Sequence, residues 1–202
     1  MTKESPEDIA AISQLIVRER ESRDMGFWNR MKACFLKDSE INISWFSGNG
    51  EAFVEGSKDM AARGMKATHR LGPILVNQNG NRAVATLSGI IDVPTEVNGV
   101  ELMLSSHCLM CYRVEKQNSG WGIFSFSAIY RRDEFIPAVL GQSITIPEDE
   151  LKKYRHAYRN LSYSLALKGY EVNNDMPGID RPETVRAMLE ELFGWADLPV
   201  PD

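Results

Sequence analysis

The sequence predicts an α+β fold in which a curved antiparallel sheet packs on N-terminal helices and is followed by a C-terminal helical extension. Three observations indicate this arrangement: apolar residues at helical spacing near the N-terminus, long strand-like stretches joined by short turns in the middle, and helical spacing again near the C-terminus. With 202 residues, the chain is expected to form one domain, with a sheet-containing part over residues 1–140 and the extension over residues 141–202.

The first helix is expected to begin after Ser5, because serine caps helix N-termini and Pro6 suits the first turn. Its apolar stripe gives way to a charged turn at residues 19–24, which resembles a solvated helix end unless one edge points into a polar pocket. Gly26 breaks the helix, and a second, short helix is expected at residues 27–31.

Residues 40–46 alternate between apolar and polar side chains, which predicts a strand after a turn at residues 37–39. A short extended piece is expected at residues 53–54. A glycine–serine pair at residues 56–57 then predicts the cap of a third helix over about residues 58–66.

Long strands are predicted over residues 71–78, 82–93, 100–116 and 121–132. The Asn79–Gly80 pair is a strong hairpin signal, and consecutive strands joined by short turns form an antiparallel meander. Because several of these strands are roughly twice the usual ~5–6 residues, we expect strong curl or bulges.

The extension is expected to hold two helices. One is predicted from Pro147 to Gly169, where Leu151, Tyr154, Tyr158, Leu161 and Leu165 share a face. The other is expected to begin near Pro182, after a loop over residues 173–178.

Charge and composition exclude several classes of function. The chain has 23 Lys and Arg against 28 Asp and Glu, a net charge of −5, so a basic nucleic-acid footprint is not expected. No apolar run approaches the ~20 residues that span a bilayer, and the N-terminus lacks an apolar signal core. We therefore expect a cytoplasmic protein that does not enter membranes.

The three cysteines, Cys34, Cys108 and Cys111, form no disulfide framework and are expected to be reduced. Cys108 and Cys111 match a C-x-x-C pattern, but they fall within a predicted strand, where positions three apart point to opposite faces. Packing is therefore the expected role, and no metal site is predicted, because no second ligand pair lies at usable spacing.

Three short motifs follow one another along the chain. Asp24 lies four residues before Trp28, a Thr-His pair follows at residues 68–69, and a Gly-Trp pair at residues 120–121 precedes the last long strand. In this order, over about residues 6–135, the chain resembles the SnoaL-like members of the nuclear transport factor 2-like superfamily. The resemblance implies a cone-shaped fold, in which a curved sheet wraps around a long helix and encloses a pocket.

Scytalone dehydratase-type lyases, bile acid 7α-dehydratase and hexachlorocyclohexane dehydrochlorinase are similar in this region. The resemblance implies a His–Asp pair that works without metal or cofactor, and the pair falls on His69 and Asp24. A histidine near its ~6.5 reference pKa is a good base, and a carboxylate on its other nitrogen fixes the tautomer. The structural alternative is a hydrogen-bonded core histidine at a strand end and a helix-end carboxylate.

The chain departs from the dehydratase pattern at two pocket tyrosines. Arg23 stands just before the helix aspartate, and Trp45 stands on the first predicted strand. Arg131 matches an arginine in the final-strand region of the dehydrochlorinase, although Arg132 is an alternative. In place of the tyrosines, Arg23 and Arg131 are expected to hold a phenolate or alkoxide, and Trp45 is a candidate pocket wall.

Three further residues are candidates for substrate binding, each with a structural alternative. Phe126 and Tyr130 on the last long strand either line the pocket or belong to the core, and His107 either lines the pocket or packs under a helix. Glu19 and Arg20 are expected to form a solvated face rather than to bind a ligand.

The predicted function is that of a cofactor-independent lyase acting on a small hydrophobic, aromatic hydroxylated compound. His69 would remove a proton, Asp24 would orient it, and water or formaldehyde would depart. Residues 158–183 resemble a branch that breaks down aromatic plant compounds such as a lignin-derived diarylpropane diol. The alternatives are an isomerase or cyclase of this fold, a non-catalytic ligand-binding protein, and a dioxygenase small-subunit-like module. A homo-oligomer, dimer or trimer, is expected.

Overall fold

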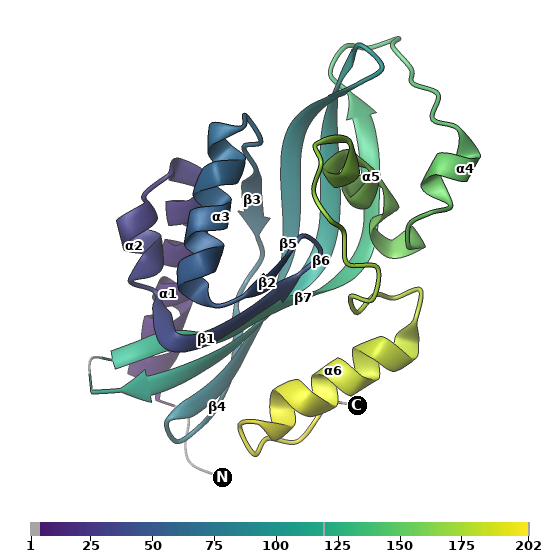
Figure 1. Cartoon of the computed structure of the whole chain (residues 1–202). Coiled ribbons are helices and arrows are strands. Elements are labelled where there is room, and N and C mark those ends of the chain that lie inside the picture. Colours follow the sequence, from purple (N-terminus) through teal and green to yellow (C-terminus); the bar gives the residue numbers. More distant parts are fainter. Residues whose placement is uncertain (1–4, 119, 202) are drawn as a thin grey trace.

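A single strongly curved sheet dominates the computed structural model, which describes residues 5–118 and 120–201 (Figure 1). Within those residues the sheet has seven strands in the order β2-β1-β7-β6-β5-β3, and β4 also pairs with β5. The strands are β1 (Phe35–Ile43), β2 (Phe46–Gly48), β3 (Thr68–Leu71), β4 (Leu75–Asn79), β5 (Arg82–Val97), β6 (Val100–Gln117) and β7 (Gly120–Pro137).

Helices cover both faces of this sheet. Figure 1 shows α1 to α3 on one side, whereas α6 lies against the other side. The helices are α1 (Pro6–Met25), α2 (Trp28–Lys32), α3 (Gly50–Ala62), α4 (Glu148–Leu151), η1 (His156–Tyr158), α5 (Arg159–Leu167) and α6 (Pro182–Gly194). Among the described residues, no helix is both long enough and apolar enough to cross a membrane.

The predicted α+β fold and its long meander are confirmed. Strands β5, β6 and β7 are consecutive and antiparallel, and shifts of register between β6 and β7 mark the expected irregularities. One pairing is different, because β1 lies parallel to β7. The sheet is therefore mixed and open, and its first strand pairs with its last one.

The region between β1 and β3 differs from the sequence-based expectation. The expected turn at residues 37–39 belongs to β1, and the expected extended piece at residues 53–54 is helical. Helix α3 begins at Gly50 because the Asn49 side chain caps it by accepting the Ala52 N–H at 2.9 Å. The glycine–serine pair at residues 56–57 therefore lies inside the helix.

The expected single strand at residues 71–78 is two strands, β3 and β4, because Pro73 has no N–H to donate to a ladder. The expected helix at residues 147–169 is likewise divided into α4, η1 and α5. The break contains buried Arg155, which binds Asp180 through both Nε (2.9 Å) and Nη2 (2.6 Å). This ion pair holds the chain in a turn where helical spacing alone predicted continuity.

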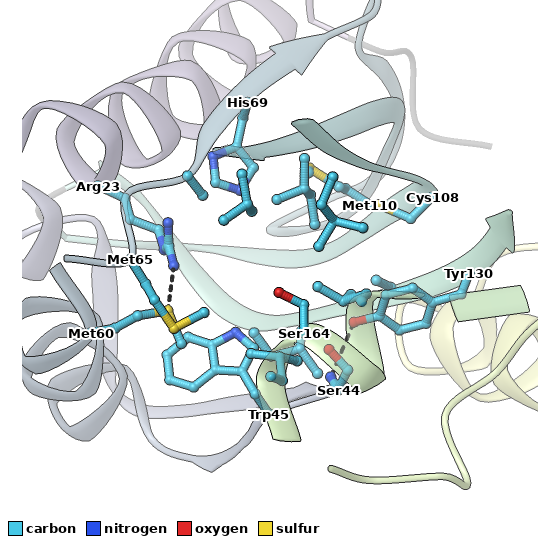
Figure 2. Close-up of a pocket in the computed structure, with 18 of the residues that line it drawn as sticks. Arg23, Ser44, Trp45, Met60, Met65, His69, Cys108, Met110, Tyr130 and Ser164 are labelled. Atoms are coloured by element: carbon cyan, nitrogen blue, oxygen red, sulfur yellow. Dashed lines mark hydrogen bonds between the residues drawn. The ribbon is translucent and has the colours of Figure 1, made fainter. Parts of the chain in front are cut away.

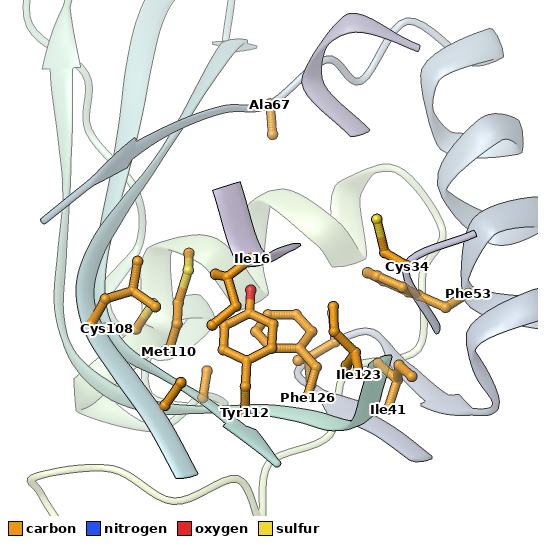
Figure 3. Close-up of a cluster of buried hydrophobic side chains, with 14 of the residues drawn as sticks. Ile16, Cys34, Ile41, Phe53, Ala67, Cys108, Met110, Tyr112, Ile123 and Phe126 are labelled. Carbon is orange, nitrogen blue, oxygen red and sulfur yellow. The ribbon is translucent and has the colours of Figure 1, made fainter. Parts of the chain in front are cut away.

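The main core lies between α1 and the concave face of the sheet (Figure 3). Tyr112 and Phe126 stack there with ring centroids 4.7 Å apart, and both contribute to a cluster that includes Ile16 and Phe53. A second cluster forms on the outer face, where Phe193 of α6 packs over the sheet. The two clusters make the sheet rigid enough to position a site on its concave side.

Gly50 allows α3 to pack closely against β1. A Cβ at this position would lie 2.5 Å from Phe35 Cβ, whereas a Cβ at Gly194 in α6 would meet nothing within 4 Å. Gly50→Ala is therefore expected to lower the free energy of unfolding by about 1–3 kcal/mol through overpacking. Gly194→Ala should leave it unchanged or slightly raised. Urea unfolding of both variants checks this, and equal midpoints would contradict it.

Candidate active site

A cavity opens between the concave face of the sheet and helices α1, α3 and α5 (Figure 2). Together with the open solvent at its mouth, the space measures about 670 Å³. Its walls are mostly apolar, with Ile43, Phe53, Met60, Met65, Ala67, Ile91, Val93, Leu104, Cys108, Met110, Phe126, Ala128, Leu161 and Leu165 among its lining residues.

Asp24 and His69 meet at the edge of this cavity. One carboxylate oxygen of Asp24 lies 2.6 Å from His69 Nδ1, and the other accepts the backbone N–H of His69 at 2.7 Å. The His69 side chain is 3% exposed and lines the cavity, and Asp24 lies behind it. The sequence-predicted pair is therefore brought together, with both carboxylate oxygens in use.

Local structure explains why these two residues meet. Helix α1 ends just after Asp24, because Gly26 adopts a left-handed φ of 73° and its N–H caps the last turn. His69 lies on β3, an edge strand paired with β5, so its backbone N–H is free to bind a partner outside the sheet. The end of α1 thus supplies a carboxylate, and the edge of β3 supplies the backbone and ring N–H groups that it accepts.

Burial keeps the His69 imidazole neutral at neutral pH, and Asp24 orients it. Burial lowers the pKa of the imidazole to about 4, and the charges of Arg20 and Arg23 act in the same direction against the Asp24 hydrogen bond. Burial opposes ionisation of Asp24, but its hydrogen bonds to His69 bring the pKa of the carboxyl below its usual value. A neutral imidazole that donates Nδ1–H to Asp24 keeps a lone pair on Nε2. That atom bonds no described residue, and Figure 2 shows the ring projecting into the cavity.

Glu19 and Arg20 do not form the expected solvated face, because both are buried on α1. They bind each other through two hydrogen bonds, and the Arg20 guanidinium lies 4.6 Å from the centre of the Phe126 ring. Burial alone would lower the pKa of Arg20, but the carboxylate of Glu19 raises it above its usual value. Arg20 therefore lines the cavity as a neutralised cation.

Arg23 lines the cavity without such a partner. Its guanidinium makes one hydrogen bond among the described residues, to the Met60 sulfur at 3.6 Å (Figure 2). Burial lowers its pKa to about 10, and repulsion from Arg20 adds to the effect, so the group is still protonated at neutral pH. The cavity thus holds a cation that no described carboxylate neutralises through an ion pair.

Trp45, Phe126 and Tyr130 also line the cavity, as expected. Trp45 lies in the two-residue turn between β1 and β2 rather than on a strand. The Tyr130 oxygen accepts the backbone N–H of Ser44 at 3.0 Å, and burial raises the pKa of the phenol well above its usual value. Tyr130 is therefore a neutral hydroxyl that also ties β7 to the β1–β2 turn.

Arg131 and His107 lie outside the cavity, which corrects the expectation for both. Side chains alternate along a strand, and Tyr130 and Cys108 occupy the inward positions next to them. Arg131 donates to Ser88 Oγ at 3.2 Å, and His107 Nε2 lies 3.4 Å from Glu134, in a hollow on the other face of the sheet. Neither side chain reaches a molecule held beside His69.

Cys108 and Cys111 point to opposite faces, as the strand pattern predicted. Cys108 lines the cavity and Cys111 packs beneath α6, and burial raises the pKa of each thiol to about 12. Neither is a reactive thiolate at neutral pH. Among the described residues, no three His, Cys, Asp or Glu side chains gather as metal ligands would.

Arg20, Ser44 and Ser164 also line the cavity, which was not expected from the sequence. For Arg20 a signal was present, since Ile12, Ile16, Arg20 and Asp24 follow one another at a spacing of four along the buried face of α1. No such signal marked the serines, because their positions depend on a tight turn and on how α5 packs on the sheet.

Comparison with known proteins agrees with this geometry. A family model described as the SnoaL-like domain matches residues 4–127. The chain belongs to the SnoaL-like domain family. Two relatives come from the fungus Fusarium vanettenii: a PEP2-like protein, 32% identical over 77% of this chain and 69% of the relative, and pea pathogenicity protein 2, 30% identical over 85% and 77%.

Solved structures of the same fold include enzymes. The hexachlorocyclohexane dehydrochlorinase LinA-type3 of Novosphingobium barchaimii superposes with a TM-score of 0.53 at 16% identity, over 68% of this chain and 94% of that one. A scytalone dehydratase-like protein of Novosphingobium aromaticivorans gives 0.52 at 13% identity, over 67% and 95%. At these identities the likeness concerns the fold, which in this SnoaL-like chain carries the dyad described above.

The lowered pKa of His69 predicts how stability depends on pH. Between pH 6.5 and 4.5 the unfolded chain binds a proton at this residue that the folded chain does not, so the free energy of unfolding falls as pH falls. His69→Gln is expected to reduce this slope by up to about 1.4 kcal/mol per pH unit. His156→Gln, at an exposed position, should not. Denaturant titrations at several pH values measure both, and identical slopes for His69→Gln and wild type would contradict the assignment.

Proposed function

We propose that this SnoaL-like protein is a lyase that works by acid–base catalysis on a small hydrophobic, aromatic hydroxylated compound, without a cofactor. The observation that carries the proposal is the Asp24–His69 pair, whose free Nε2 faces an apolar cavity. In such a site a neutral imidazole removes a proton from carbon or from a hydroxyl group, and the carboxylate stabilises the imidazolium that forms.

The charges around the cavity suit this step. Proton transfer creates an imidazolium at His69 and an anion on the substrate. The imidazolium is paired with Asp24, and the unpaired Arg23 guanidinium is available for the substrate anion. Each new charge would thus meet an opposite charge that is already in place, and the apolar walls would strengthen both interactions.

The walls also indicate the kind of substrate. Phe53, Phe126 and Trp45 offer aromatic surfaces, and Met60 and Met65 are flexible enough to make room in a narrow cavity. After proton abstraction from carbon, the freed electron pair would form a C=C bond as hydroxide leaves, and the imidazolium of His69 would return its proton to give water. After abstraction from the primary hydroxyl of a diarylpropane diol, a C–C bond would break to release formaldehyde, and its electron pair would form the C=C bond as the second hydroxyl leaves as water with the proton from His69. The dehydrochlorinase among the structural neighbours is also named for an elimination.

The first test is catalytic. Purified protein with a chelator present would be incubated with hydroxylated aromatic dimers, and formaldehyde and conjugated products would be assayed. His69→Gln is expected to lower kcat/KM by about 10²–10⁴-fold. Asp24→Asn should cause a similar loss, because an amide can select the wrong imidazole tautomer. His107→Gln, outside the cavity, is the matched control and should retain activity.

Full activity in His69→Gln would reject the dyad. A product of unchanged mass would assign the chain to an isomerase or cyclase instead, since those reactions begin with the same proton transfer. Specific binding without any turnover would favour a non-catalytic ligand-binding role.

The second test compares the roles of Arg23 and Arg131 in stabilising the substrate anion. Arg23→Gln is expected to lower kcat by about 10²–10³-fold with little change in KM, because the interaction with the anion strengthens only as charge develops. Arg131→Gln should stay within about twofold of wild type, because its side chain lies on the other face of the sheet. Steady-state kinetics of both variants check this, and a rise in KM alone for Arg23→Gln would limit its role to ground-state binding.

A further inference from the structure

The cavity wall opposite His69 carries polar groups that proton transfer to His69 does not use. They are the hydroxyls of Ser44 and Ser164 and the indole N–H of Trp45, which together we term the serine–tryptophan cluster (Figure 2). Ser44 and Trp45 form the turn between β1 and β2, and Ser164 lies on α5. The cluster therefore joins the sheet-containing part of the chain to the extension.

None of these groups has a hydrogen-bond partner among residues 5–118 and 120–201. Ser44 is 1% exposed and Ser164 is 2% exposed. The hydroxyl oxygen of Ser44 (Oγ) is buried and has no hydrogen-bond partner among the described residues. Figure 2 shows the Ser164 hydroxyl and the nitrogen-bearing edge of the Trp45 ring directed into the cavity. Buried polar groups are normally paired, and because these three groups line one cavity, a ligand atom held there would complete their hydrogen bonding.

The cluster is held in place from outside the cavity. The Ser44 N–H donates to Tyr130 Oη at 3.0 Å, and the Ser44 carbonyl accepts the N–H of Asn173 at 2.8 Å. The Trp45 ring packs against Phe53 and, edge-on, against Tyr170, with centroids 5.7 and 6.1 Å away. The backbone of one member and the ring of another are thus fixed before a ligand arrives, which lowers the entropic cost of binding.

We propose that the substrate carries a second oxygen, remote from the reacting end, that accepts a hydrogen bond from Trp45 and is flanked by Ser44 and Ser164. An indole N–H only donates, so the ligand atom must be an acceptor. The cluster contains no cation, so the oxygen is neutral: a hydroxyl, a methoxy ether or a carbonyl. This inference rests on the proposed function and narrows its substrate class to aromatic compounds with oxygen functions at both ends, which excludes hydrocarbon and purely halogenated substrates.

Binding of two simple phenols tests the proposal without requiring turnover. Para-methoxyphenol and para-ethylphenol are similar in size, but only the first has an oxygen at the far end. Isothermal titration calorimetry with wild-type protein is expected to show about tenfold tighter binding of para-methoxyphenol. In Ser44→Ala/Ser164→Ala, and separately in Trp45→Phe, the preference should fall below about twofold.

Ser125→Ala is the matched control, because Ser125 is also a buried serine but lies beneath α6, outside this cavity, and the variant should keep the preference. Equal affinity for the two phenols in wild type, an undiminished preference in both cluster variants, or binding of neither phenol would overturn the proposal. His69→Gln should retain the preference. If the preference is found but elimination is never observed, the proposed function fails and the oxygen-binding cluster stands.

Discussion

The site depends on a single carboxylate that holds one histidine at two points. Asp24 accepts both the backbone N–H and the ring N–H of His69, 45 residues away in the chain. The backbone contact fixes the end of α1 to the edge strand β3, and the ring contact fixes the tautomer and the direction of the imidazole. The same carboxylate therefore contributes to both the fold and the chemistry. The position of His69 follows from the way α1 packs against β3.

Helix α1 carries several charged side chains into the interior of the protein. Within its last turns it buries a Glu19–Arg20 pair and presents both Arg23 and Asp24 to the cavity region. Burying an ion pair contributes little net stability, and an unpaired cation beside apolar walls is costly. A helix that packs in a core normally buries apolar side chains. Buried charges that break this pattern are expected mainly at functional sites.

The C-terminal extension packs on both faces of the sheet. Its α5 closes the cavity with Leu161, Ser164 and Leu165, and its α6 covers the outer face of the meander. The Arg155–Asp180 pair ties the segments before and after α5 together. The extension thus completes the cavity wall that faces the base, although the family model matches only residues 4–127.

The sequence by itself determined the α+β class, the long meander and the candidate dyad, because strand alternation, hairpin signals and the order of short motifs are local features. Only the tertiary structure decided which arginine serves the cavity. The sequence assigned Arg131 to catalysis and Arg23 to substrate binding, but strand alternation beside Tyr130 and a bulge in β7 at Arg131 place the Arg131 side chain on the outer face. The tertiary structure also decided that Glu19 and Arg20 are buried. A run of charged residues in a sequence shows that the segment is polar, but not which other elements pack against it. The break between α4 and α5 likewise depended on the distant partner of Arg155, which no local pattern specifies.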